Sequence, residues 1–116
     1  MISEIKAAEL ILSAEPDLAL SNYSNANIFK LAYRFAYLVR DEIVTGEFNR
    51  LQQGFETVAV LLKEGNGMVR MAMSNIFIYS IVNTLSARLP YSMKAFQMMP
   101  VCLKREYYRQ INSSSL

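Results

Sequence analysis

The apolar residues of this chain recur every three or four positions over long stretches, which is the spacing of one face of an α-helix. In the clearest stretch, between Glu47 and Glu64, one side is formed by Phe48, Leu51, Phe55, Val58 and Leu62. The outer face holds Asn49, Arg50, Gln53, Glu56 and Lys63, so the pattern predicts a helix that packs on one face and meets solvent on the other. Gly54 is a mild defect in this helix and indicates a close crossing with another helix.

The same spacing predicts further helices over residues 3–14, 27–45, 68–87 and 100–111, with a short turn or helix between Tyr91 and Met99. Ser3 is suited to capping the first helix and Gly46 to ending the second, and a polar turn is expected over residues 21–25. Residues 68–87 are apolar on nearly all sides, and no second strand-like run is present to pair with them. We therefore predict an all-α fold, a single domain over residues 1–116 that forms an antiparallel bundle of four to five helices.

The residues available for catalysis are few. The chain has no histidine, the usual general base near neutral pH, and a single cysteine, Cys102. Motifs such as GxSxG, HExxH, CxxC, the EF-hand loop and the Walker loop are absent from the sequence. Asp41 and Glu42 are predicted to form a solvated acidic helix end, although a bundle core could still bring together carboxylates from distant helices. We expect no catalytic residue, no cofactor, no metal and no enzymatic activity.

Charge is distributed unevenly along the chain. Residues 1–66 hold six Lys or Arg and nine Asp or Glu, a net charge of −3, whereas residues 67–116 hold six and one, a net charge of +5. Such an asymmetry can steer an acidic partner, or the excess charge can simply remain solvated. No apolar run is long enough to cross a bilayer, and the first residues lack the pattern of a signal peptide, so we expect a cytoplasmic protein without a membrane span.

Candidate binding residues gather in the basic C-terminal third. Tyrosine and arginine are favoured at protein interfaces, and six of the seven methionines lie between Met68 and Met99, where they can line an adaptable groove or fill the core. Met98 and Met99 are expected to be exposed, because two adjacent residues on a turn do not easily both face inward. The predicted partner-binding residues are Arg88, Tyr91, Lys94, Met98, Met99, Lys104, Arg105, Tyr108 and Arg109.

The order of these features, from the Phe-rich third helix through the Gly-Asn-Gly break to the stretch PVCLKREY at residues 100–107, resembles small all-helical bacterial domains of unknown function. Some of those domains are similar to immunity proteins that accompany secreted antibacterial toxins. The resemblance implies a stoichiometric binder that masks a toxin's active site, and it assigns no functional residue.

Our leading hypothesis is a non-enzymatic protein-binding module, plausibly an immunity-type inhibitor with an acidic toxin or effector as its partner. Homodimerisation is compatible with it. The alternative is a nucleic-acid-associated regulator that uses the basic C-terminal face. A small enzyme based on buried carboxylates is the third and least favoured hypothesis.

Overall fold

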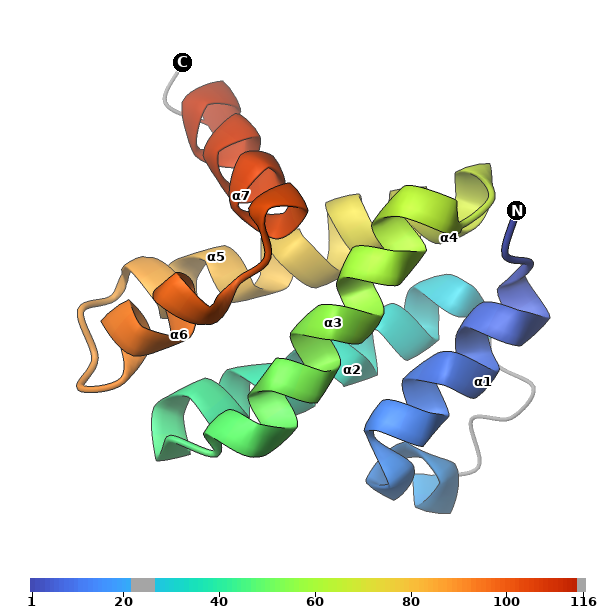
Figure 1. The fold of residues 1–116 in the computed structure, drawn as a ribbon, viewed down its shortest axis with the longest axis horizontal. Coiled ribbons are helices and arrows are strands. Elements are labelled where there is room, and N and C mark those ends of the chain that lie inside the picture. The colour runs from blue at the N-terminus through green and yellow to red at the C-terminus, as the bar shows by residue number, and fades with distance from the viewer. Residues whose placement is uncertain (22–26, 115–116) are drawn as a thin grey trace.

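The computed structural model describes residues 1–21 and 27–114, so the predicted turn over residues 21–25 lies almost entirely outside them. Within these residues every regular element is a helix (Figure 1). The α-helices are α1 (Glu4–Ala14), α2 (Ile28–Thr45), α3 (Phe48–Glu64), α4 (Gly67–Met71), α5 (Tyr79–Ser86), α6 (Ser92–Met98) and α7 (Val101–Ser114). A 3₁₀-helix, η1 (Pro16–Ser21), follows α1, and a π-helix, η2 (Ala72–Ile78), joins α4 to α5.

The all-helical class is confirmed, but the predicted number of helices is too low. Because α4, η2 and α5 follow one another without a break, residues 67–86 form one continuous helix, and the described residues contain six helices rather than four to five. The additional one is α6, which the sequence left as a turn or short helix. The π-helical turns of η2 were not predicted.

Local signals fix the helix ends close to their predicted positions. The Ser3 hydroxyl oxygen accepts a hydrogen bond of 3.2 Å from the Lys6 N–H and caps α1. Gly46 ends α2 in the left-handed conformation, at φ 77°. The Asn66 side chain accepts a hydrogen bond of 2.9 Å from the Val69 N–H, which starts the long helix directly after α3. The predicted starts and stops therefore reflect capping chemistry that is local in the sequence.

The bundle is not antiparallel throughout. Phe35 of α2 packs against Phe77 of η2 with ring centroids 4.8 Å apart, and Arg40 donates a hydrogen bond of 3.3 Å to the Thr84 hydroxyl oxygen of α5. Residue numbers rise together along the two helices, so α2 and the long helix run in the same direction (Figure 1). The reason is geometric: tight turns make α3 antiparallel to both of its sequence neighbours, and those two neighbours must then be parallel to each other.

The core lies where α2, α3 and the long helix meet. Its largest fully buried side chains include Phe35, Phe55, Phe77, Leu51, Leu61, Met73 and Ile81. Gly54 is buried in α3, where it faces α2, and a Cβ there would lie 3.4 Å from the Val39 side chain, in ordinary van der Waals contact. No helix in the described ranges has the length and apolar character needed to cross a membrane.

Two side chains that were expected to be exposed are buried. Met99 is 3% exposed and Met98 is half-buried, because α6 ends at Met98 and the extended backbone before Pro100 turns the next side chain inward. Glu42 is 5% exposed, since it lies three residues after the buried Val39 and continues the core-facing stripe of α2. Only Asp41 of the predicted acidic end is exposed.

Candidate functional site

A groove of about 950 Å³ opens between the end of α5, the turn after it, α6 and α7. We call it the C-terminal groove. It is lined by Leu85, Arg88, Leu89, Pro90, Ser92, Met93, Phe96, Tyr107, Tyr108, Ile111 and Asn112. Most of these side chains are apolar or aromatic, as is usual for surfaces that bind another molecule.

The walls of the C-terminal groove are held by contacts within the protein. Phe96 of α6 meets Tyr107 and Tyr108 of α7 edge to face, with ring centroids 5.2 and 5.9 Å apart. The buried Ser92 hydroxyl donates a hydrogen bond of 2.9 Å to the Thr84 carbonyl and ties the start of α6 to α5. Aromatic pairs of this geometry stabilise beyond their buried area. The groove is therefore formed before any partner binds.

Large apolar surface is exposed along the groove. Met93 is 74% and Tyr108 52% exposed, and Leu89 is partly exposed beside them. Arg88 supplies a cation at the rim and adopts a left-handed backbone at φ 56°, in the position after a helix end where glycine is usual. An arginine held in a strained conformation at the edge of an apolar groove is consistent with a binding role.

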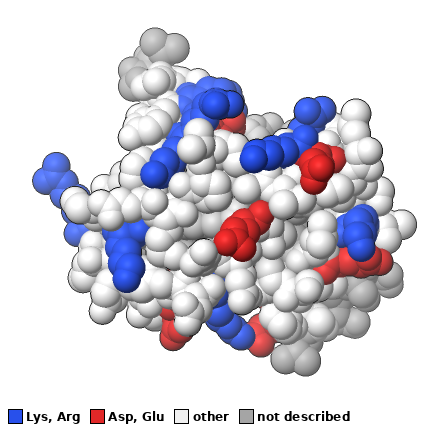
Figure 2. Space-filling view, in the orientation of Figure 1, with Lys and Arg blue, Asp and Glu red and all other residues white. Residues whose placement is uncertain are grey.

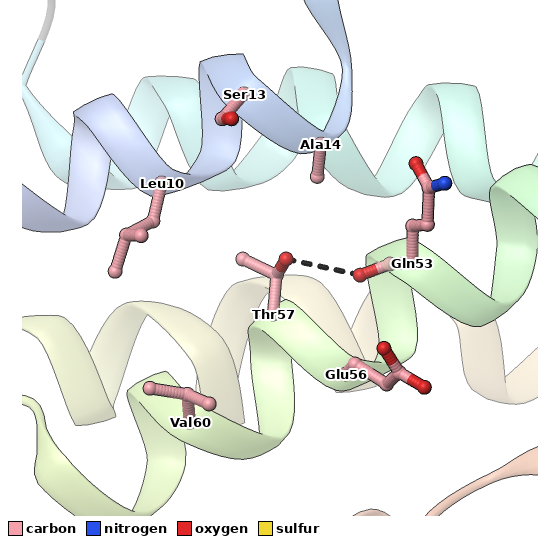
Figure 3. Close-up of a pocket in the computed structure, with 7 residues that line it drawn as sticks. All are labelled: Leu10, Ser13, Ala14, Gln53, Glu56, Thr57 and Val60. Atoms are coloured by element: carbon pink, nitrogen blue, oxygen red, sulfur yellow. Dashed lines mark hydrogen bonds between the residues drawn. The ribbon is translucent and has the colours of Figure 1, made fainter.

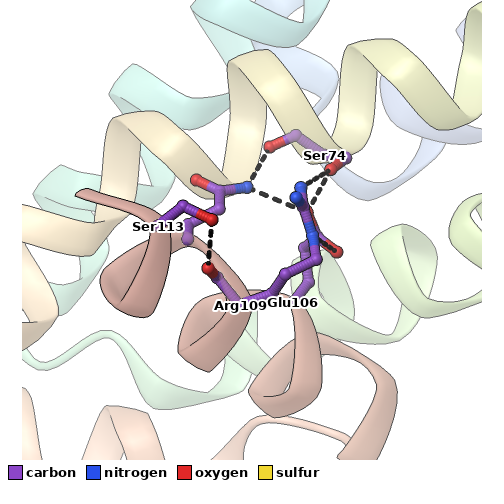
Figure 4. A network of polar contacts seen from close by, with 5 residues as sticks. Ser74, Glu106, Arg109 and Ser113 are labelled. Atoms are coloured by element: carbon purple, nitrogen blue, oxygen red, sulfur yellow. Dashed lines mark hydrogen bonds and ion pairs between the residues drawn. The ribbon is translucent and has the colours of Figure 1, made fainter. Parts of the chain in front are cut away.

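A polar network fastens α7, one wall of the groove, to η2 (Figure 4). Glu106 accepts hydrogen bonds from the Arg109 guanidinium, with Nε 3.0 Å from each carboxylate oxygen, and from the Ser74 hydroxyl. Gln110 donates to the Ser74 carbonyl at 2.5 Å. The bonds from Arg109, followed by those from Ser74 and Gln110, lower the pKa of Glu106 to about 2 against the opposing effect of its burial. Glu106 is therefore ionised at neutral pH and holds α7 in place.

Of the predicted partner-binding residues, Arg88 and Tyr108 line the groove. Lys104 lies beside it, with Nζ 5.4 Å from the centroid of the Phe96 ring, and Arg105 is exposed on α7. Arg109 faces η2 and pairs with Glu106.

The remaining predicted residues lie away from the groove or inside the protein. Tyr91 packs edge to face on Phe48 at 5.5 Å, and Lys94 Nζ lies 4.1 Å from the centroid of the same ring. Met98 and Met99 are half-buried and buried, as described above. The predicted set is thus divided among several surfaces.

The apolar lining of the groove was largely missed. Tyr107 and Ile111 recur at helical spacing in α7, whereas Phe96 and Leu89 were not identified from the sequence. Met93 belongs to the methionine cluster, which pointed to the groove together with Arg88 and Tyr108.

Positive charge accompanies the groove. Residues 85–112 contain five Lys or Arg and one acid, Glu106, a net charge of +4. Figure 2 shows Lys and Arg side chains over α5, α6 and α7 with little acidic surface among them, whereas both signs are present over α1 and α3. The basic C-terminal third predicted from the sequence is therefore a basic end of the folded molecule.

Two acids from distant helices meet inside the protein. Glu15, directly after α1, is fully buried and lies beside Glu42 of α2. Both carboxylate oxygens of Glu15 and one of Glu42 accept no hydrogen bond from the described residues. Burial first, and then the neighbouring carboxyl group of Glu15, raise the pKa of Glu42 to about 9, so Glu42 is protonated at neutral pH. Arg50 lies nearby but is paired with Asp17 at 3.4 Å on the surface.

This acid pair has the composition of a carboxylate dyad, but solvent does not reach Glu15 and barely reaches Glu42. A substrate would have to open the bundle to contact either carboxylate. Within the ranges described, no group of three or more potential ligands from His, Cys, Asp and Glu is arranged to hold a metal ion.

A smaller hollow of about 320 Å³ lies between α1 and α3 (Figure 3). Leu10, Ser13 and Ala14 face Gln53, Thr57 and Val60 across it, with Glu56 at its edge. The Thr57 hydroxyl donates to the Gln53 carbonyl at 2.9 Å and is thus engaged within its own helix. Glu56 is the one charged side chain among the described residues that line this hollow, so it has no second charged group beside it for acid–base chemistry.

The family model of a domain of unknown function (DUF7674) matches residues 6–113. The chain belongs to this family. The matched range contains the whole C-terminal groove and both members of the acid pair, so both lie within the family's domain. No curated protein and no solved structure matches the chain. The family description gives no activity, and the immunity-protein likeness remains a hypothesis.

Proposed function

We propose that this family member is a non-enzymatic protein-binding module that takes the apolar face of a partner helix into the C-terminal groove. The observation that carries the proposal is a preformed apolar groove with Met93 and Tyr108 exposed along it. An amphipathic helix lying in an apolar groove is a recurring mode of recognition, and methionine adapts its shape to the side chains of the partner.

The charge around the groove favours an acidic partner. Arg88 lies at the rim and Lys104 beside Phe96, in a segment with a net charge of +4. A more specific form of the proposal is an immunity-type inhibitor that binds a bacterial toxin and masks its active surface. That form is supported by the sequence resemblance and by a groove suited to one partner segment at a time.

Binding of nucleic acid is a weaker explanation of the same residues. Phosphate recognition needs several cations on one surface. Here Arg109 is engaged by Glu106, and Lys94 lies over Phe48 on another side of α6 from the groove. The cations of the C-terminal third therefore do not line up along a single track.

Titration calorimetry with the product of the neighbouring gene tests the proposal. We expect a 1:1 complex whose affinity falls at least about tenfold in Met93→Asp and in Tyr108→Ala. Val101→Ala is the matched control, because Val101 is 71% exposed on α7 but does not line the groove. Unchanged affinity in both groove variants, with circular dichroism showing that they are folded, would contradict the proposed site. If the parent protein does not bind the product of the neighbouring gene, that product is not its partner.

A further inference from the structure

The outer face of α2 carries a second hollowed surface, which shares no lining residue with the C-terminal groove. One hollow of about 680 Å³ lies between the first half of α2 and Ile76 of η2, and a smaller one lies between the second half and Thr84 of α5. Tyr37 lines both, so the two hollows adjoin at this side chain. From Phe29 to Val44 they extend about 22 Å along the helix axis. We call this surface the α2 face.

The exposed side chains of the α2 face are unusual for a helix that meets only water. Tyr33 and Tyr37 are 57% and 60% exposed, four residues apart on the same side of the helix, and Val44 continues the row. The outer positions of α3 have a different character: they hold mostly amides and charged groups, including Gln52, Gln53 and Glu56. Two tyrosines side by side therefore give α2 an aromatic stripe that no side chain of the described residues buries.

The charge of the α2 face is positive. Lys30 and Arg34 lie beside the tyrosines, and Arg40 is held in position by its hydrogen bond of 3.3 Å to the Thr84 hydroxyl. Asp41 is the one acid among the residues lining the two hollows. Clustered tyrosine and arginine are typical of the energetically important residues of protein interfaces. The excess of cations selects a partner with acidic side chains.

We infer that the α2 face is a second docking surface, which binds an acidic amphipathic helix of another polypeptide independently of the C-terminal groove. Apolar residues of that helix contact Tyr33 and Tyr37, and a flanking carboxylate pairs with Lys30. The length of the face matches about four helical turns. A protein helix fits better than a nucleic acid because Phe29, Ile76 and Val44 give the trough an apolar lining that apolar side chains of a helix can contact. Two docking surfaces would let one molecule bridge two partner segments.

A displayed library of acidic amphipathic helices of about 16 residues, randomised at the apolar positions, tests this inference. We expect it to enrich binders whose affinity falls at least tenfold when the target protein carries Tyr33→Ala and Tyr37→Ala. The same binders should tolerate Gln52→Ala with Gln53→Ala on α3, and also Met93→Asp in the groove. A matched library with Lys in place of the acids should enrich no helix that depends on the two tyrosines.

Other outcomes overturn the inference in distinguishable ways. Binders that depend only on Met93 and Tyr108 would refute the α2 face and leave the proposed function standing. A fluorescent single-stranded oligonucleotide that binds through Tyr33 and Tyr37 more tightly than any selected helix would replace the protein partner by a nucleic acid. Failure of both libraries to enrich any binder dependent on the two tyrosines would also refute it. Circular dichroism of each variant verifies that it is folded.

Discussion

The raised pKa of Glu42 leads to a prediction about the pH dependence of stability. Glu42 keeps its proton in the folded protein up to a pKa of about 9, whereas in the unfolded chain the same carboxyl ionises above its ordinary pKa of 4.5. Between these values the folded state binds more protons than the unfolded state, so the free energy of unfolding falls as pH rises. The contribution of Glu42 is fully favourable below pH 4.5 and is lost as pH approaches 9.

The magnitude of this pH effect on the free energy of unfolding follows from the pKa shift of Glu42. Each pH unit inside this window changes the free energy of unfolding by at most about 1.4 kcal/mol, so raising the pH from 5 to 7 lowers it by up to about 3 kcal/mol. Glu42→Gln keeps the shape of the side chain, but it has no proton to lose. We expect this variant to be more stable than the parent at pH 7, by as much as about 3 kcal/mol.

Urea denaturation followed by circular dichroism between pH 5 and pH 8.5 measures this difference. The curve of Glu42→Gln should be flatter than that of the parent across the whole range. Asp41→Asn is the control, since it removes an exposed acid on the same turn of α2 and should leave the slope nearly unchanged. The reasoning is refuted if the stability of Glu42→Gln falls with pH as steeply as that of the parent, or if the variant is the less stable protein at pH 7.

Three further predictions concern stability. Arg88→Gly should stabilise by about 1 kcal/mol in chemical denaturation, because glycine relieves the left-handed backbone, whereas Arg88→Ala should bring no such gain. Gly46→Ala should lower the melting temperature and cost about 1–2 kcal/mol, since φ is 77° and the new Cβ would lie 3.0 Å from the Tyr91 ring. Glu106→Gln should destabilise by about 1–2 kcal/mol in urea at pH 7. Its deficit should shrink as pH falls from 4.5 towards 2, where the parent's Glu106 also becomes protonated.

The predictable part of the fold is the part whose signals are local. The bounds of α3 follow to within one residue from its apolar stripe and from the glycines on either side. The π-helical turns of η2 could not be predicted, because the Ser74 carbonyl is bonded by Gln110, thirty-six residues later in the chain. The parallel course of α2 and the long helix likewise depends on the position of α3 between its two neighbours.

The candidate site likewise has a part that could be predicted from the sequence and a part that depends on how the helices pack. Arg88 and Tyr108 were identified by residue type, because arginine and tyrosine favour interfaces wherever they are exposed. The groove itself exists because α6 is short and leaves Ile111 partly uncovered beside the buried Tyr107, a matter of helix length that periodicity does not reveal. Glu42 was misassigned because its charge was given more weight than its place in the buried stripe of α2.

The parallel course of α2 and the long helix has an electrostatic consequence. Peptide dipoles of parallel helices add, so the partial negative charges of the last carbonyls of α2 and α5 lie at the same end of the molecule. The first turns of α3 and α6 begin at this end and carry partial positive charge, which opposes them. Arg88, Tyr91 and Lys94 lie next to these helix ends. The potential that a partner meets there is therefore set mainly by the side-chain cations, and association at this end should weaken as ionic strength rises.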